Sequence, residues 1–156
     1  MIRIIILVII VLVILMVIGL FYVGHQSRQM ATPSLAASLP ECPPTPNCVS
    51  SLMGPDDSHF IAPVTISDYT PADVIPAAAT VIKEMGGQIT ESNDNGIIVT
   101  FTSGLFGFVD DMQVRLDSTH QHLEVYSASR VGHSDLGVNR KRVERFRALL
   151  IQHLKK

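Results

Sequence analysis

The chain has 156 residues, of which 47% are hydrophobic and 17% are charged, and its net charge is −2 at pH 7. This composition is too apolar for an ordinary soluble domain of this size. The slightly acidic balance argues against nucleic acid as a partner, because binding to a phosphate backbone depends on clustered positive charge.

The first predicted element is an apolar segment without charges at residues 4–23. Its length, at about 1.5 Å per residue, spans a hydrocarbon core of roughly 30 Å and predicts a transmembrane helix. We favour an uncleaved anchor over a signal peptide, whose apolar core is usually about 7–15 residues long. We expect a membrane anchor over 1–24, a flexible tether over 25–41 and one folded domain over 42–156. Arg3 and Arg28 flank the apolar segment, so charge barely decides its orientation.

Cys42 and Cys48 are the two cysteines of the chain, and they enclose the sequence PPTPN. Their closeness predicts a local disulfide if the domain lies in an oxidising compartment. A redox or metal pair is less favoured, because the spacing is not Cys-x-x-Cys and no nearby histidine completes a zinc site. The disulfide would pin the tether to the domain.

Hydrophobic periodicity predicts a strand at 61–68, a helix at 73–86 that is capped by Asp73, and a final helix at 139–154. Four alternating segments between the helices predict an antiparallel meander, with turns at 93–96 and 118–122: 88–91, 97–103, 108–117 and 123–130. The order β-α-β-β-β-β-α indicates an α+β fold. We expect a two-layer domain with two helices packed on a curled antiparallel sheet of about five strands.

Alternation along 108–117 assigns its side chains to the two faces of the sheet. Asp110 falls on the covered face, and Asp111 falls on the solvent face with Gln113 and Arg115. A buried carboxylate needs a partner, and we favour an ion pair of Asp110 with Arg130 or Arg140. In the following strand, the same alternation turns two serines inward and the next arginine outward: Ser127, Ser129 and Arg130.

The stretch SASRVGHSDLGVNRKR at 127–142 leads into the final helix. If Asn139 caps this helix, three cations at 140–142 occupy its first turn, where the helix dipole favours negative charge. The compensating anion would be an aspartate of the chain or a bound phosphate, carboxylate or lipid headgroup. A helix that began at Asp135 would weaken this argument. The ligand-binding candidates are Arg130, His133, Ser134, Asp135, Asn139, Arg140, Arg142, Asp110, Asp111 and Arg115.

The distribution of charge permits an internal explanation for the same cations. Residues 41–124 hold twelve acidic residues against two basic ones, whereas 130–156 hold eight basic residues against two acidic ones. The two parts of the chain therefore attract each other. Docking of the final helix on an acidic sheet, with its charges paired or solvated, is the simpler interpretation.

Three blocks resemble the signature segments of the family catalogued as domain of unknown function 1499: CPPTPNCVSS at 42–51, GLFGFVDDMQVRL at 104–116 and SASRVGHSDLGVNRKRVE at 127–144. The resemblance covers about 45–154, and no activity is settled for the family. It implies an envelope-associated domain, which we expect on the periplasmic side of a bacterial inner membrane. The positions that carry the pattern are Cys42, Pro46, Asn47, Cys48, Ser50, Asp110, Asp111, Arg115, Ser127, Ser129, Arg130, Gly132, Ser134, Asp135, Gly137, Asn139 and Arg140.

Catalytic patterns are weak. His133, Ser134 and Asp135 are sequence neighbours and cannot generally form a catalytic relay, and His120 and His122 lie in a turn without a third metal ligand. We expect no catalytic residue, metal or cofactor. The favoured function is a binding or accessory module of the cell envelope that recognises an anionic ligand or a protein partner. The alternative is an envelope enzyme with Asp110 or Asp111 as acid or base and Arg130 or Arg140 as charge stabiliser.

Overall fold

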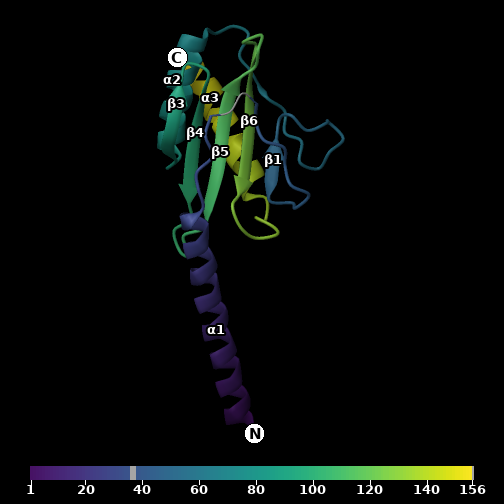
Figure 1. Cartoon of the computed structure of the whole chain (residues 1–156), viewed down its shortest axis with the longest axis vertical. Helices are drawn as coiled ribbons and strands as arrows, with labels where there is room; N and C mark the ends of the chain where they lie inside the picture. Colours follow the sequence, from purple (N-terminus) through teal and green to yellow (C-terminus); the bar gives the residue numbers. More distant parts are fainter. Residues whose placement is uncertain (36–37, 156) are drawn as a thin grey trace.

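The computed structural model describes residues 1–35 and 38–155 and shows a long N-terminal helix that carries one α+β domain (Figure 1). Helix α1 covers Ile2–Gln29. The domain contains, in chain order, β1 (Cys48–Ser50), β2 (Val64–Thr65), α2 (Pro71–Glu84), β3 (Gln88–Asn93), β4 (Gly96–Thr102), β5 (Val109–Leu116), β6 (His122–Ser129) and α3 (Val138–Leu154). The predicted fold class is confirmed.

The sheet is antiparallel and has the order β1-β6-β5-β4-β3, with β2 also paired to β6. Over the described residues it has six strands, in line with the expected number of about five, and the additional strand is β1, which has three residues and no detectable period. The predicted strand at 61–68 was too long, since only Val64 and Thr65 pair in β2. Pro63 has no amide to donate before this pair, and Tyr69 closes a turn on the carbonyl of Ile66 after it.

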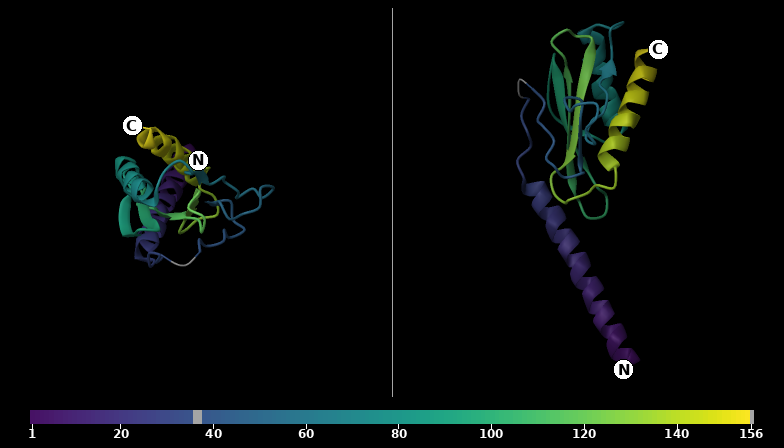
Figure 2. Two further views of the ribbon diagram at one scale, coloured as in Figure 1. Left: turned by 90° about the horizontal axis from the view of Figure 1, so that it is seen from above. Right: turned by 90° about the vertical axis from the view of Figure 1, so that its right-hand side faces the viewer.

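Helices α2 and α3 cover one face of the sheet (Figure 2). Their apolar stripes meet the inward residues of β4, β5 and β6 in one core. The predicted stripe of the last helix is confirmed at Val143, Phe146 and Leu150, which are fully buried. The inward parity of β4 to β6 is confirmed as well: Ile97, Val99, Met112, Val114, Leu116, Leu123 and Val125 all belong to this core.

The opposite face of the sheet is also partly covered, which corrects one expectation. The described residues between α1 and β1, 30–35 and 38–47, run along this face (Figure 2), and Leu39 packs there with Cys48 and Tyr126 in a second apolar cluster. Asp111 and Gln113 were expected in solvent, yet they are only 8% and 3% exposed. Strand alternation correctly placed Asp111 and Gln113 on the face opposite the two helices. It could not show that another part of the chain covers that face.

Both domain helices begin before the predicted residue. Thr70 is the N-cap of α2 and Pro71 its first residue, while Asp73 completes a capping box by accepting the Thr70 amide at 3.3 Å. Helix α3 begins at Val138 after Gly137, whose φ of 77° is left-handed. Asn139 is therefore inside the helix and not its cap.

Helix α1 is long and apolar enough to cross a membrane, a property that it shares with signal sequences. Its last turns pack on the segment 103–108 between β4 and β5. Ser27 is fully buried and its hydroxyl accepts the Val109 amide at 2.9 Å, and the Phe21 and Phe106 rings meet edge to face at 5.2 Å. Gly24 permits this approach, because a Cβ there would lie 1.9 Å from the Phe106 carbonyl oxygen.

The predicted disulfide between Cys42 and Cys48 is confirmed. It closes a loop that ends at the first residue of β1 and lies next to Leu39 and Tyr126 on the covered face. The bridge therefore fastens the chain that leaves α1 to the edge of the sheet.

Candidate functional site

The two adjacent aspartates of β5 point to opposite faces of the sheet. Asp110 faces α3, where its Oδ2 lies 2.5 Å from Nη2 of Arg142. Asp111 lies on the other face and forms a two-bond ion pair with Arg130, with both hydrogen bonds at 2.8 Å. The expected pairing of Asp110 with Arg130 or Arg140 was therefore wrong, because Arg130 follows the outward parity of β6 and Arg142 is the cation that α3 turns toward the sheet.

Arg130 joins the sheet to the end of α1. Besides Asp111, its guanidinium donates to the carbonyl oxygens of Ser27 at 3.3 Å and Met30 at 2.7 Å, and to the Thr32 hydroxyl at 3.1 Å. A cation at the C-terminal end of a helix is favourable because the last carbonyls lack partners within the helix. Arg130 thus compensates both the Asp111 carboxylate and the end of α1.

Tyr126 lies on the same covered face as the ion pair of Asp111 and Arg130, and its pKa is shifted there. Its burial raises the pKa of its hydroxyl, and the nearby negative charge of Asp111 raises that pKa further. The phenol is thereby kept neutral beside the ion pair.

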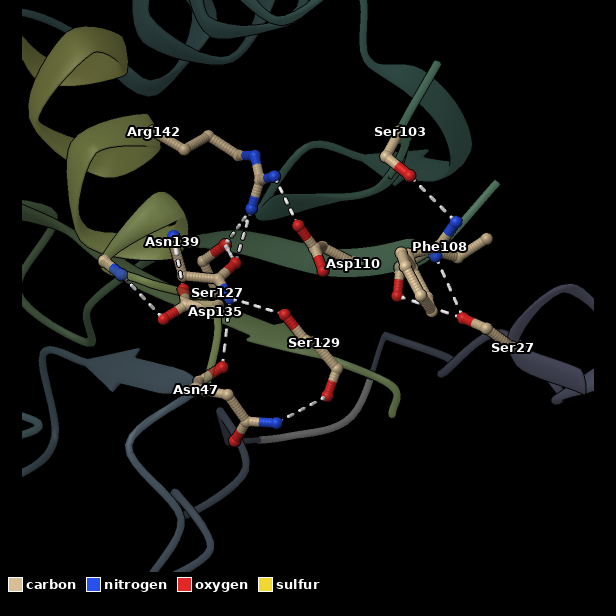
Figure 3. A network of polar contacts seen from close by, with 12 residues as sticks. Ser27, Asn47, Ser103, Phe108, Asp110, Ser127, Ser129, Asp135, Asn139 and Arg142 are labelled. Atoms are coloured by element: carbon tan, nitrogen blue, oxygen red, sulfur yellow. Dashed lines mark hydrogen bonds and ion pairs between the residues drawn. The ribbon is translucent and has the colours of Figure 1, made fainter. Parts of the chain in front are cut away.

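A buried polar network surrounds Asn139 on the helix side (Figure 3). Its side-chain oxygen accepts from the Ser127 hydroxyl at 2.6 Å and from Arg142, and its amide donates at 3.0 Å to Ser129 Oγ and to the Asn47 carbonyl oxygen. The inward orientation of both serines is confirmed. Because the amide of Asn139 is fully engaged, the network acts as a fastening between α3, β6 and the chain before β1.

Asp135 supplies the negative charge at the start of α3. Its carboxylate accepts the backbone amides of Gly137 at 3.0 Å and Asn139 at 2.6 Å. Carboxylates are favourable at this position because the first amides of a helix lack partners. Of the two alternatives for the compensating anion, an aspartate of the chain or a bound anion, the aspartate is the one that lies at these amides.

The other predicted candidates are spread over the domain. Arg140 donates to the Ser58 carbonyl at 2.8 Å, while His133 and Ser134 are exposed in the segment before α3. His133, Ser134 and Asp135 form no relay, since the carboxylate of Asp135 is directed to backbone amides. Arg115 lies five residues from Asp110 along β5, roughly 17 Å away at a strand rise of about 3.4 Å. It lines a separate pocket with Asp117 and His120.

A cationic pocket of about 390 Å³ opens between α3 and the ends of β4 and β5. Lys141, Arg142 and Arg145 line it from one helix, against the single carboxylate of Asp110. The Arg142 guanidinium also stacks 4.7 Å from the centre of the Phe101 ring. The remaining lining residues are Met85, Thr102, Ser103 and Val138.

Lys141 and Arg145 were missed as site residues. Both are exposed, and their spacing of four residues places them on one face of α3. That spacing is visible in the sequence, but helical periodicity alone does not show that this side of α3 borders the ends of β4 and β5. Within 1–35 and 38–155, no group of three or more His, Cys, Asp or Glu residues could hold a metal ion.

A comparison with family models matches residues 38–150 to a family described as "Protein of unknown function (DUF1499)". The match contains all three sequence blocks, so the resemblance predicted from them is confirmed. No curated protein matches the chain.

Proposed function

Because the chain belongs to the DUF1499 family, whose description assigns no activity, we propose a function from its geometry: a membrane-anchored, extracytoplasmic binding module that holds an anionic group in the cationic pocket. The observation that carries the proposal is the excess of positive charge in that pocket, where Lys141, Arg142 and Arg145 meet only Asp110. Arg142 is already paired with Asp110, so an incoming anion would be held by Lys141 and Arg145.

The contacts of α1 support an uncleaved anchor. Ser27 pairs with the backbone of Val109, Arg130 donates to two carbonyls at the end of the helix, and Arg28 donates to the Gly107 carbonyl at 3.0 Å. Cleavage after α1 would remove Ser27 and leave the buried Val109 amide without its partner. It would also take one carbonyl acceptor away from Arg130 in its ion pair with Asp111. The helix end therefore behaves as part of the domain, unlike a leader that is discarded.

The disulfide supports placement outside the cytoplasm. Cys42 and Cys48 are bonded to each other, and such bonds persist in oxidising compartments. Together with one membrane span, this favours an extracytoplasmic domain, which in a bacterial cell is the periplasmic side of the inner membrane.

A binding role is favoured over acid–base catalysis by the engagement of both aspartates. Asp110 and Asp111 lie on opposite faces of β5, and each is paired with an arginine whose side chain is at most 11% exposed. A general acid or base must reach the proton that it transfers, and these two carboxylates cannot approach one substrate together.

The proposal is tested with the full chain in detergent, using inorganic phosphate as the probe. The double variant K141E/R145E is compared with K83E/K155E, which changes net charge equally at exposed lysines outside the pocket. Phosphate should raise the unfolding temperature of the wild type and of the control pair, but not that of K141E/R145E. Native mass spectrometry should show a retained anion with the same dependence. Equal responses from the two double variants would disprove binding in this pocket.

A further inference from the structure

We propose that the domain rests on the membrane surface through two loops, 103–108 and 131–137, which place Leu105 and Leu136 in the interfacial layer of the bilayer that α1 crosses. This inference rests on the proposed membrane anchor, and it does not depend on whether Lys141 and Arg145 hold a free anion in the pocket. The occupant of the surface is the lipid bilayer itself. Figure 1 shows both loops at the end of the domain from which α1 leaves.

The depth of the first loop follows from its contact with α1. Phe21 lies inside the apolar segment 4–23, two residues before its end, and therefore roughly 3 Å inside the hydrocarbon boundary if that segment spans the core. The Phe106 ring is 5.2 Å from the Phe21 ring. Because Phe106 contacts Phe21, the loop 103–108 cannot lie entirely outside the headgroup layer. Leu105, its neighbour, is 71% exposed in the protein alone and would point into this layer.

The contact is built into the fold and is not an accident of an exposed loop. Gly24 brings the α1 backbone against the Phe106 carbonyl, and Arg28 donates to the Gly107 carbonyl at 3.0 Å. The Ser103 hydroxyl accepts the Phe108 amide at 2.9 Å and closes the loop at its base. The loop therefore keeps its position relative to the helix.

The second loop presents Leu136 in an unusual state. This residue is 88% exposed and has a left-handed φ of 55°, a conformation that bulky side chains rarely adopt. Neighbouring hydrogen bonds hold it there: Ser134 Oγ accepts the Leu136 amide at 3.3 Å, and Asp135 accepts the following amide at 3.0 Å. A leucine that is held outward has no packing role within the domain, but it suits an apolar environment beyond it.

Exposed apolar side chains gather at this end of the domain. Beyond α1, the described part of the chain exposes five large hydrophobic residues, and four of them lie in the two loops or at the helix ends beside them: Met30, Leu105, Leu136 and Val138. The fifth, Leu52, lies in the segment between β1 and β2. Scattered exposed leucines need no explanation, but clustering beside a membrane helix does.

The nearby cations complete the argument for lipid. Lys141 and Arg145 are exposed on the first turns of α3, next to Val138. Basic residues at a membrane surface attract anionic headgroups, and apolar side chains beside them enter the interface. A protein partner would have to reach a surface that α1 already holds against the bilayer.

The experiment uses single cysteine variants of the full chain that carry an environment-sensitive fluorophore, reconstituted in vesicles of phosphatidylcholine and phosphatidylglycerol. The native cysteines are bonded to each other, so the introduced thiol is the one that reacts. L105C and L136C test the two loops. L12C reports on the centre of α1, and L52C is the matched exposed leucine away from that end of the domain.

We expect lipids with a quencher close to the headgroup to remove most of the emission at L105C and L136C, while L52C is unaffected and L12C responds to a deep quencher. If L12C is quenched but L105C and L136C behave like L52C, the anchor stands and the docking proposal is overturned. If L12C is not quenched either, the anchor itself is wrong. Quenching at only one of the two loops also overturns the proposal.

Discussion

Asp110 and Arg142 form a nearly buried ion pair that joins the middle strand of the sheet to α3, with the two side chains 13% and 11% exposed. The same guanidinium contacts Ser127, Asn139 and the Phe101 ring. One arginine thus connects β5, β6, β4 and its own helix. The basic stretch before and within α3 therefore contributes to the fold, and other cations on the surface of α3 line the pocket beside it.

The Asp110→Asn variant should be strongly destabilised. Removal of one partner from a buried ion pair leaves the other charge uncompensated, which typically costs about 3–5 kcal/mol. Urea unfolding followed by circular dichroism would measure the loss in the free energy of unfolding. The double variant D110L/R142M should recover part of the loss, because apolar residues of similar size can replace a buried pair. An unchanged midpoint for D110N would contradict the contact.

Replacement of Arg130 by lysine should loosen the junction between α1 and the domain. Lysine cannot reproduce the two-bond pair with Asp111 together with the bonds to Ser27 and Met30. Hydrogen exchange should therefore accelerate at residues 27–32 more than in the core strands. R145K, a change at an exposed arginine of α3, is the control and should leave exchange at the junction as it is.

Gly24 and Gly19 provide a matched test of the α1 contact. A side chain at position 24 would collide with the Phe106 carbonyl, whereas nothing lies within 4 Å of a Cβ at position 19. Overpacking of this kind typically costs about 1–3 kcal/mol. G24V should lower the unfolding temperature of the domain in detergent, and G19V should not. Equal unfolding temperatures would place the last turns of α1 outside the domain.

The lowered pKa of Asp117 leads us to expect that the turn between β5 and β6 loses stability in acid. Burial opposes its ionisation, but the Thr119 hydroxyl and the amides of His122 and Gln121 outweigh that effect and lower the pKa of the carboxyl to about 2. Because the pKa is depressed in the folded state, the charged carboxylate stabilises the protein above the unfolded pKa of about 3.9, and this stability is lost as pH falls toward about 2. D117N should be less stable at neutral pH, with a smaller further loss in acid. T119V should have a free energy of unfolding between those of the wild type and D117N, as measured by urea unfolding at pH 7 and pH 2.5.

Removal of the disulfide should lower the free energy of unfolding by a moderate amount. On the chain-entropy relation, a loop of about seven residues contributes about 2 kcal/mol. The variant C42S/C48S should lose this amount in urea unfolding, with faster hydrogen exchange in β1. If the variant and the wild type unfolded at the same urea concentration, the bridge would have no part in fastening this segment.

Periodicity was sufficient for the helices and the meander, because β4, β5 and β6 alternate cleanly and their turns carry clear signals. The short strands were harder to predict: β1 has three residues and β2 has two, so neither establishes a period. The capping of α3 was wrong for a different reason. Asn139 is an excellent cap by residue type, but the left-handed Gly137 and the Asp135 carboxylate start the helix earlier.

The pairing of charges could be predicted only in part. Strand parity correctly separated Asp110 from Asp111, and it placed Arg130 on the face of Asp111. The choice of Arg142 for Asp110 follows from helical spacing, since position 142 is three residues after the buried Asn139 and four before the buried Phe146. The cover over Asp111 could not be foreseen, because it depends on the path of the chain between α1 and β1.

That path has a consequence for how the domain is displayed. A domain on a flexible linker can move through a hemisphere whose radius grows with the length of the linker. Here residues 30–35 and 38–47 lie along the sheet, while Arg130 and Gly24 join the helix directly to the domain. Insertion of extra residues near position 34 would lengthen the connecting segment, but it would not move the domain farther from α1. The domain would keep one orientation relative to α1, so a binding partner would meet it only in that orientation.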